Sequence, residues 1–481
     1  MLYLNDEARR RRTMNTRKPT AFLSRYIGNA AFYRMVMAVA VPIMIQNGVT
    51  QFVSLLDNIM VGSVGTLPMG GVGIANQLIF VFNLAIFGAV SGAGIFGAQY
   101  YGKGDHDGVR YAFRFKLYIG LVLALLGTLL FLTLDEPLIS LYLQGEATEA
   151  DRLATLGYAK DYLHLMLLGF VPFVLTQCYA GTLRETGCTV VPMVAGVVSV
   201  LVNLCFNALL IYGLLGFPAL GIRGAAIATV ISRVAEMLIV MVWTHRHPER
   251  NPFIRGAYRS LRIPAPLTVA IAKKTLPLML NETLWAGGMA MLAMCYSLHS
   301  LDVVPAQTMS STISNVFNVA FLAMGNAVGI IVGQLLGAGR LDEARDTDRK
   351  LITFSVLICV VIGAVMAMLS PFIPMLYPAT DSVRTLATDF LLISALCMPL
   401  NSLANACYFT LRSGGKTLVT FLFDSCFEWC ITLPTAFLLT LLTDLTIVPV
   451  FLICQLLVIA KCAVGLTMIA RGVWVNNIVQ S

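Results

Sequence analysis

Four carboxylates stand inside long apolar stretches of this 481-residue chain, where an acidic side chain is costly to keep: Asp57, Glu282, Asp424 and Glu428. An acidic group surrounded by hydrocarbon usually faces a polar interior and often marks the path of an ion or a substrate. A lone carboxylate suits a proton, whereas a carboxylate among several other oxygen ligands suits a metal cation. These four residues are therefore candidates for binding a small cation.

In each of two pairs of polar residues, the two members are four positions apart, so they share one face if their segment is helical. Asp424 and Glu428, with Trp429 beside them, could bind a cation together, or one of them could bridge to a neighbouring helix. Asn203 and Asn207 could present amide oxygens to a cation, or could form hydrogen bonds between helices. The spacing alone leaves both alternatives open for each pair.

The composition determines which elements must hold these residues. Hydrophobic residues make up 58% of the chain and charged residues 12%, with a mean hydropathy of +0.79, whereas a soluble chain carries roughly 25% charged residues. Twelve apolar runs are long enough to cross a bilayer, and they lack the alternation of barrel strands. The sequence therefore predicts an all-α polytopic membrane protein with twelve transmembrane helices. They are expected at residues 34–61, 70–98, 115–134, 161–183, 190–213, 220–243, 274–297, 306–336, 351–373, 385–411, 417–441 and 446–470.

The 33 lysines and arginines are unevenly placed around these runs. The N-terminal tail, every second loop and the C-terminal tail hold most of them. The loops on the other side hold only Arg152, Lys160, Arg223 and Arg384. Because positive charge is retained in the cytoplasm, we expect both termini to be cytoplasmic. The net charge of +8 then reflects orientation rather than a nucleic-acid partner.

The eleven cysteines are scattered along the chain, with no CxxC pair and no histidine cluster beside them. We expect small buried thiols, no disulfide and no zinc site.

Two short motifs recur six runs apart. TLRxxGxT occurs at residues 182–189 and 410–417, and GQxxGxG at 333–339 matches residues 97–104, where one residue is inserted. This repetition predicts a duplicated six-helix unit whose halves are related by an axis along the membrane normal. We expect a cytoplasmic tail at 1–33, a first lobe at 34–244, a cytoplasmic linker at 245–271, a second lobe at 272–472 and a C-terminal tail at 473–481.

Motifs of soluble enzymes are missing or misplaced. The segment Gly414-Gly415-Lys416-Thr417 lacks the earlier glycine of a phosphate-binding P-loop, because Thr410 stands there. The GxGxxG match at residues 92–97 lies inside an apolar run, where small residues favour close helix packing. We therefore expect no enzyme activity.

Several segments together carry a family resemblance. Pro42 precedes Asp57 by fifteen residues in the first run, and the stretch from Gly224 to Thr229 follows the Asn203 and Asn207 pair. The seventh run contains LNExxW at residues 280–285, and the eleventh contains Phe-Asp-Ser at 423–425. From residue 35 to residue 470 the sequence resembles the multidrug and toxic compound extrusion (MATE) transporters.

This resemblance implies two pseudo-symmetric six-helix lobes that export organic, often cationic and aromatic compounds by alternating access. By position, Asp57, Asn203, Asn207 and Thr229 match the cation site of the first lobe, where Na⁺ is expected. Some family members carry Asp where this chain has Asn207, so the resemblance leaves open whether Na⁺ or H⁺ is the coupling ion.

In the second lobe, Glu282 matches a carboxylate position of the family, and Asn401 stands where some members carry Asp. We take these two with Asn281, Asp424 and Glu428 as the candidate residues of the second lobe for cation or substrate.

The leading hypothesis is a secondary antiporter that performs multidrug efflux in exchange for Na⁺ or H⁺. The alternative is a flippase or exporter of a lipid-linked or polar lipid substrate, since fold does not determine function. That alternative predicts a basic central cavity, whereas the ionisable residues in the runs are mostly acidic. We expect a small-molecule organic substrate, no cofactor besides the coupling ion, no nucleic-acid partner, and a monomer in the bilayer of the cell (plasma or inner) membrane.

Overall fold

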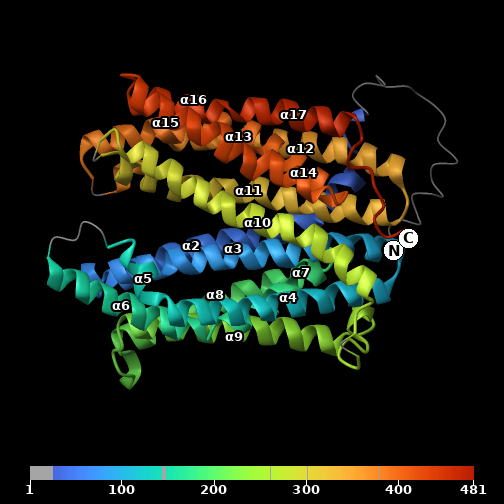
Figure 1. Cartoon of the computed structure of the whole chain (residues 1–481), viewed down its shortest axis with the longest axis horizontal. Helices are drawn as coiled ribbons and strands as arrows, with labels where there is room; N and C mark the ends of the chain where they lie inside the picture. The colour runs from blue at the N-terminus through green and yellow to red at the C-terminus, as the bar shows by residue number, and fades with distance from the viewer. Residues whose placement is uncertain (1–24, 144–147, 261, 301, 378, 481) are drawn as a thin grey trace.

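The computed structural model describes residues 25–143, 148–260, 262–300, 302–377 and 379–480, and these residues form helices with no β-strand among them. The expected tail at 1–33 lies mostly outside the described residues. Figure 1 shows the helices in two layers, with the first half of the chain below and the second half above.

The long helices of the first lobe follow the apolar runs in order, joined by the short helix α5 (Asp135–Ser140) and the turn η2 (Leu214–Gly216). They are α2 (Ala30–Gly62), α3 (Thr66–Lys103), α4 (His106–Thr133), α6 (Glu149–Leu167), α7 (Phe170–Glu185), α8 (Val190–Tyr212) and α9 (Ile222–Arg246).

The second lobe repeats this order after the turn η3 (Pro252–Ile254). Its α10 begins at Ala265, inside the stretch expected to be linker. Its helices are α10 (Ala265–Ser297), α11 (Val303–Gly337), α12 (Leu341–Leu369), η4 (Ile373–Leu376), α13 (Asp381–Ser413), α14 (Thr417–Phe421), η5 (Leu422–Cys426), η6 (Glu428–Thr432), α15 (Leu433–Leu442), α16 (Ile447–Leu456) and α17 (Val458–Ala470).

Ten helical stretches of the described chain are long and apolar enough to cross a membrane, and α6 and α7 together form an eleventh. Helix α10 is not among them, because polar residues such as Lys273, Asn281 and Glu282 interrupt its apolar run. With α10, each of the twelve expected runs has its helix or helix pair.

The fourth run departs from expectation, because it is not one straight helix. Helices α6 and α7 meet at a bend of 48° at Leu168 and Gly169. The eleventh run is interrupted as well, since η5 and η6 are π-helical turns that hold Asp424 and Glu428. Such turns are rare in helices and occur often at functional sites.

Each lobe has its own apolar core, and a third apolar cluster joins the lobes. In the first lobe Phe82 of α3 stacks on Phe170 of α7, with ring centroids 4.0 Å apart. The joining cluster places Val36 and Ala40 of α2 among residues of α11 such as Ala327. The first helix of the chain therefore packs against the second lobe as well as its own.

Helix α10 makes the corresponding crossing in the opposite direction, and Figure 1 shows its first half beside α3. Gly88 and Gly92 allow the close approach. A Cβ at Gly88 would lie 2.7 Å from the Cα of Met279, and one at Gly92 would lie 2.6 Å from the Cα of Thr275. Small residues four apart let two helix backbones come together in this way. The first helix of each lobe thus lies on the second helix of the other.

The repeated GQxxGxG motifs meet across the lobes at the end of the bundle where α3, α7, α11 and α13 finish, here called the tail end. Gln99 Nε2 donates to the main-chain oxygen of Ser413 at 2.9 Å, and Gln334 Nε2 donates to that of Glu185 at 2.8 Å. Ser413 and Glu185 occupy equivalent positions of the two TLRxxGxT motifs. The two repeated motifs therefore form reciprocal contacts between the lobes.

Glycine is required where the two backbones meet at the tail end. A Cβ at Gly102 would lie 1.9 Å from the main-chain oxygen of Gln334, and a Cβ at Gly337 would lie 1.8 Å from that of Gln99. Any larger residue at either position would push the two lobes apart.

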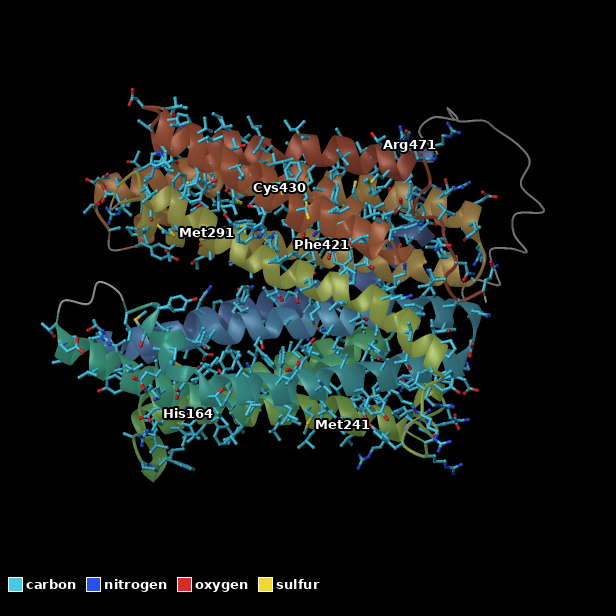
Figure 2. The ribbon with its side chains drawn as sticks, viewed as in Figure 1. His164, Met241, Met291, Phe421, Cys430 and Arg471 are labelled. Atoms are coloured by element: carbon cyan, nitrogen blue, oxygen red, sulfur yellow. The ribbon has the colours of Figure 1, made fainter. Side chains whose placement is uncertain are left out.

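The C-terminal segment Gly472–Gln480 crosses this contact, and Figure 2 shows Arg471 just before it at the tail end. Lys103 of the first lobe donates to the main-chain oxygen of Val479 at 2.6 Å, and Ile478 N donates to Gln99 Oε1 at 2.9 Å. Trp474 is 1% exposed and lies against Gly414 of the second lobe. The segment therefore touches both lobes.

Charged side chains hold α5 against α6 at the end of the first lobe opposite the tail end, where Figure 2 labels His164. Asp135 begins α5 and contacts His164 at 2.9 Å and Lys160 at 3.4 Å. Burial raises the pKa of Asp135, but the hydrogen bond from Glu136 N and the contacts with His164 and Lys160 outweigh it, so the pKa lies below its usual value.

Candidate functional site

The structure brings the four candidate residues of the first lobe together from three helices. Asn207 of α8 donates to the carboxylate of Asp57 of α2. Asn207 Nδ2 also lies 3.0 Å from Asn203 Oδ1, and Asn203 lies 3.2 Å from Thr229 Oγ1 of α9. When the Asn203 amide is turned end for end, its nitrogen reaches Asp57 Oδ1 at 2.8 Å. The cluster is polar and compact.

This first-lobe cluster retains an unused acceptor. Asn207 is 1% exposed, and its Oδ1 is buried with no hydrogen-bond partner among the described residues. A buried polar atom without a partner is costly, so such an atom in a native fold calls for an additional ligand. Within the described chain Asp57 forms no ion pair, so its charge has no resident cation.

The donor set suits a small monovalent cation. It offers one carboxylate, two amide groups and one hydroxyl, all of which provide oxygen ligands of the kind that hard cations prefer. A single carboxylate balances a single positive charge, so a proton or Na⁺ would leave the cluster neutral in its apolar surroundings. Sequence reasoning missed Tyr162 of α6, a buried residue whose hydroxyl faces Thr229 and Asn76 beside this cluster.

In the second lobe, Asn281 organises the polar residues. It is fully buried, and its Nδ2 lies 3.1 Å from Asp424 Oδ2 and 3.3 Å from the Tyr408 hydroxyl. Ser425 Oγ donates to Asn281 Oδ1 at 2.8 Å. Tyr408 in turn donates to Glu282 Oε1 at 3.1 Å. Asn281, Glu282 and Asp424 therefore form one network, as their candidate roles require.

Asp424 already has a cationic partner, because Lys461 of α17 forms an ion pair with it. Of the two alternatives for Asp424, the bridge to a neighbouring helix is therefore the one in the structure. The sequence offered a signal for this partner. A single lysine in an apolar run needs a carboxylate in the bundle interior.

The other two candidates of the second lobe form no hydrogen bond to this network within the described residues, although Lys461 and Asp424 act electrostatically on Glu428. Glu428 Oε1 is buried with no hydrogen-bond partner, and its side chain lies against Gly288 of α10. Trp429 donates instead to the main-chain oxygen of Leu284 at 2.9 Å. Within the described residues, Asn401 has no hydrogen bond to Asn281, Glu282 or Asp424.

A cavity of about 90 Å³ lies between the lobes, near the tail end. Arg184 and Glu185 line it from α7, and Phe409 and Arg412 line it from α13. Sequence reasoning missed this site, although the two arginines are the repeated residues of the TLRxxGxT motifs.

Comparison with known proteins places this arrangement in a family. The MatE family model matches residues 42–209 and 277–438, which is more than half of the chain. The chain belongs to the MATE family. It is 25% identical over 424 residues to the probable multidrug resistance protein YoeA of Bacillus subtilis, covering 87% of this chain and 89% of that protein. It is 26% identical over 421 residues to the multidrug resistance protein MdtK of Edwardsiella ictaluri, covering 86% and 89%.

Solved structures agree on the fold. A multidrug resistance MATE family transporter of the MOP superfamily in its outward-facing conformation superimposes with a TM-score of 0.82 at 19% identity, over 95% of this chain and 99% of that one. A MATE structure described as the straight conformation gives 0.82 at 19% identity, over 94% and 99%. The predicted family and the fold of twelve helices in two lobes are confirmed. This MATE protein is a multi-pass membrane transporter of the multidrug efflux class and not an enzyme.

Proposed function

We propose that this MATE transporter is an antiporter that couples export of organic compounds to inward movement of Na⁺ or H⁺. The observation that carries the proposal is the first-lobe cluster, where, in the part of the chain that the structure describes, Asp57 has no ion-pair partner and Asn207 Oδ1 has no hydrogen-bond partner. A site with one unbalanced carboxylate and spare oxygen acceptors gains most from an incoming monovalent cation.

The electrostatics of the second lobe favour the first lobe as the place of coupling. Asp424 already holds the ammonium of Lys461, and Glu282 accepts from Tyr408. Glu428 keeps an unpartnered oxygen, but the same ammonium of Lys461 acts electrostatically on it. An ion arriving at Asp424 would have to displace a tethered lysine. We therefore assign the coupling ion to Asp57, Asn203, Asn207 and Thr229, and assign Asn281, Glu282 and Asp424 to an internal network.

Coupling requires that the ion and the substrate favour different states of the transporter, because a ligand shifts an equilibrium only by its differential affinity. Asp57 lies on α2, which also packs against α11 of the second lobe, and Pro42 stands inside this helix. A proline in a helix interior removes one hydrogen bond and is a common place for a kink. Binding at Asp57 would thus act on a helix that touches both lobes.

The placement in the cell follows from charge. The excess of lysine and arginine on one side supports cytoplasmic termini in a plasma or inner membrane. We propose a monomer, because each lobe of a single chain supplies its own polar cluster.

The proposal is tested with purified protein in liposomes, using a fluorescent organic cation and imposing Na⁺ and H⁺ gradients separately. We expect one gradient to drive transport in the wild type, and Asp57→Asn to remove this response while leaving the protein folded. Asp161→Asn is the matched control, since Asp161 lies at the surface in an ion pair with Arg223. If neither gradient drives transport of any compound in a broad panel, the antiporter proposal is wrong.

One observation favours the alternative of a lipid-linked or polar lipid substrate. Arg184 and Arg412 make the cavity between the lobes basic, which a phosphate-bearing lipid would require. Transport of a fluorescent lipid-linked probe in the same liposomes, without transport of soluble organic cations, would establish this alternative instead.

A further inference from the structure

The two TLRxxGxT motifs deliver one guanidinium each to the cavity between the lobes. Arg184 comes from the end of α7 and Arg412 from the end of α13, at equivalent places in the repeat. The duplicated scaffold therefore sets two positive charges around one space on opposite sides of the lobe boundary.

The acidic residue in this cavity does not neutralise them. Both carboxylate oxygens of Glu185 are held by Lys116 Nζ, at 2.5 and 2.7 Å, and Lys116 is fully buried. The Lys116 ammonium also donates to Thr182 Oγ1 at 3.0 Å. Glu185 is thus already balanced. Glu236 of α9 interacts electrostatically with Arg184, so Arg412 carries the less compensated of the two positive charges.

Among the described residues, each arginine keeps one buried nitrogen without a hydrogen-bond partner, Nε in Arg184 and Nη1 in Arg412. Arg184 Nη2 donates to Gln46 Oε1 at 2.7 Å. Arg412 is only 6% exposed, and with respect to the described residues it forms no ion pair and its Nη1 is buried with no hydrogen-bond partner. Glu282 and Glu185 are the nearby carboxylates, and neither comes within 4.0 Å of its nitrogens. A buried guanidinium without a partner needs an anion to offset its desolvation.

Aromatic rings flank the same guanidinium. Arg412 Cζ lies 5.2 Å from the ring centroid of Phe409 and 5.7 Å from that of Phe87, which belongs to the other lobe. These rings hold the guanidinium plane in place and provide apolar surface beside it. With about 90 Å³, the cavity has room for roughly six to nine water-sized groups. This is enough for a head group but not for a whole drug-sized molecule.

We infer that Arg412 and Arg184 bind the carboxylate of an aromatic organic substrate in the cavity between the lobes. The guanidinium of Arg412 pairs with the carboxylate, Arg184 contributes the second positive charge, and Phe87 and Phe409 contact the ring that bears the carboxylate. The binding site stands on its own geometry, whereas its use in export rests on the proposed function. The substrate class is then aromatic zwitterions and anions, rather than compounds that carry only a positive charge.

The test uses two dyes that differ in one group. Rhodamine 110 carries a free carboxylate, and rhodamine 123 is its methyl ester. Binding of each to the purified full chain in phosphatidylcholine nanodiscs is measured by fluorescence anisotropy. Because hydrogen bonds to charged groups are the strong ones, we expect the free carboxylate to bind roughly tenfold or more tightly.

Variants assign this preference to the arginine. Arg412→Gln should reduce the ratio of the two affinities to near one, and Arg412→Lys should restore part of it. Arg223→Gln is the matched control, because Arg223 is an exposed arginine of the first lobe that lies outside the cavity. Thermal melting of each variant confirms that it is folded. Equal binding of the two dyes by the wild type, or an unchanged ratio in folded Arg412→Gln and Arg412→Lys, overturns the inference.

A lipid head group is the competing source of an anion, and the membrane composition separates the two. If the carboxylate preference is present in phosphatidylcholine but disappears when phosphatidylglycerol is added, a lipid occupies the cavity and the assignment to a soluble substrate is wrong. If the preference persists but neither ion gradient drives dye transport, the site stands and the antiporter proposal fails.

Discussion

Replacing Gly337 by alanine should loosen the contact between the lobes at the tail end. A Cβ there would lie 1.8 Å from the main-chain oxygen of Gln99, whereas real Cβ atoms essentially never come within 3.0 Å of another heavy atom. Both sides of this contact are main chain of long helices, so no side-chain rotation relieves it. The helices must separate locally by roughly 1.2 Å, because packed interiors have no spare volume.

The size of the effect follows from what this separation breaks. Gln99 Nε2 donates to Ser413 O, and Gln99 Oε1 accepts from Ile478 N, both at 2.9 Å. Asn477 Nδ2 donates to Gly337 O at 3.3 Å. Each bond contributes about 1 kcal/mol net. The closed arrangement of the tail end should therefore lose about 3 kcal/mol, which changes its population relative to an open state on the order of 100-fold.

The assay is a distance measurement between the lobes at this end. Spin labels at Asp107 and Asp342, exposed residues near the starts of α4 and α12, report the separation in a cysteine-free background. We expect Gly337→Ala to populate a longer distance. Gly73→Ala in α3 is the control, because a Cβ there meets nothing within 4 Å. A Gly337→Ala protein with the same distance distribution as the wild type would refute the reasoning.

The repeat provides an internal check. Gly102→Ala places a Cβ 1.9 Å from the main-chain oxygen of Gln334, so it should produce the same opening as Gly337→Ala. The double variant should add little to either single one, because contacting sites are not additive and the lobes have already separated.

Three further variants test the roles of the charged residues Lys116, Lys461 and Asp135. Lys116→Met leaves Glu185 buried without its partner, so we expect a loss of about 3–5 kcal/mol in unfolding free energy, measured by denaturation in detergent. Lys461→Met frees Asp424, and Na⁺ or low pH should then raise the melting temperature more than in the wild type; an equal response would contradict the role of Lys461 as a resident cation. Because the pKa of Asp135 is lowered in the folded protein, its contribution to stability is present above the usual pKa of 3.8 and is lost as the pH falls below that value. Asp135→Asn should therefore make the melting temperature less dependent on pH between pH 5 and pH 3 than in the wild type.

The helical fold was predictable because hydrocarbon permits few structures. Twelve apolar runs that lack strand alternation can only become helices, and the repeats at residues 182–189 and 410–417 reveal the duplication. The bend between α6 and α7 did not follow from hydropathy, because the apolar run continues through Leu168 and Gly169; Gly169 and Pro172 three residues later were the local signals for it. The crossing of α2 and α10 onto the opposite lobe depends on contacts between distant segments, which hydropathy does not encode.

The candidate sites show the same limit. Asp57, Asn203 and Asn207 were found because polar groups in apolar runs stand out individually. The distinction between a free carboxylate and a paired one was missed, because Asp424 meets Lys461 only after α17 has packed. Arg412 was missed for a related reason. At the end of its run it reads as an ordinary loop cation, whereas the folded protein buries it.

Duplication followed by divergence of charge explains why two similar lobes can have different tasks. Equivalent positions of the repeat hold Glu185 in one lobe and Ser413 in the other, and only the first has a lysine partner. At positions that the repeat does not relate, Asp57 has no ion-pair partner among the described residues, whereas Asp424 holds Lys461. A carboxylate with a resident ammonium responds weakly to an outside cation, because the ion must first displace a tethered charge. Under the proposed antiport, the ion gradient would act mainly on the first lobe, and the arginines between the lobes would be left to bind the substrate.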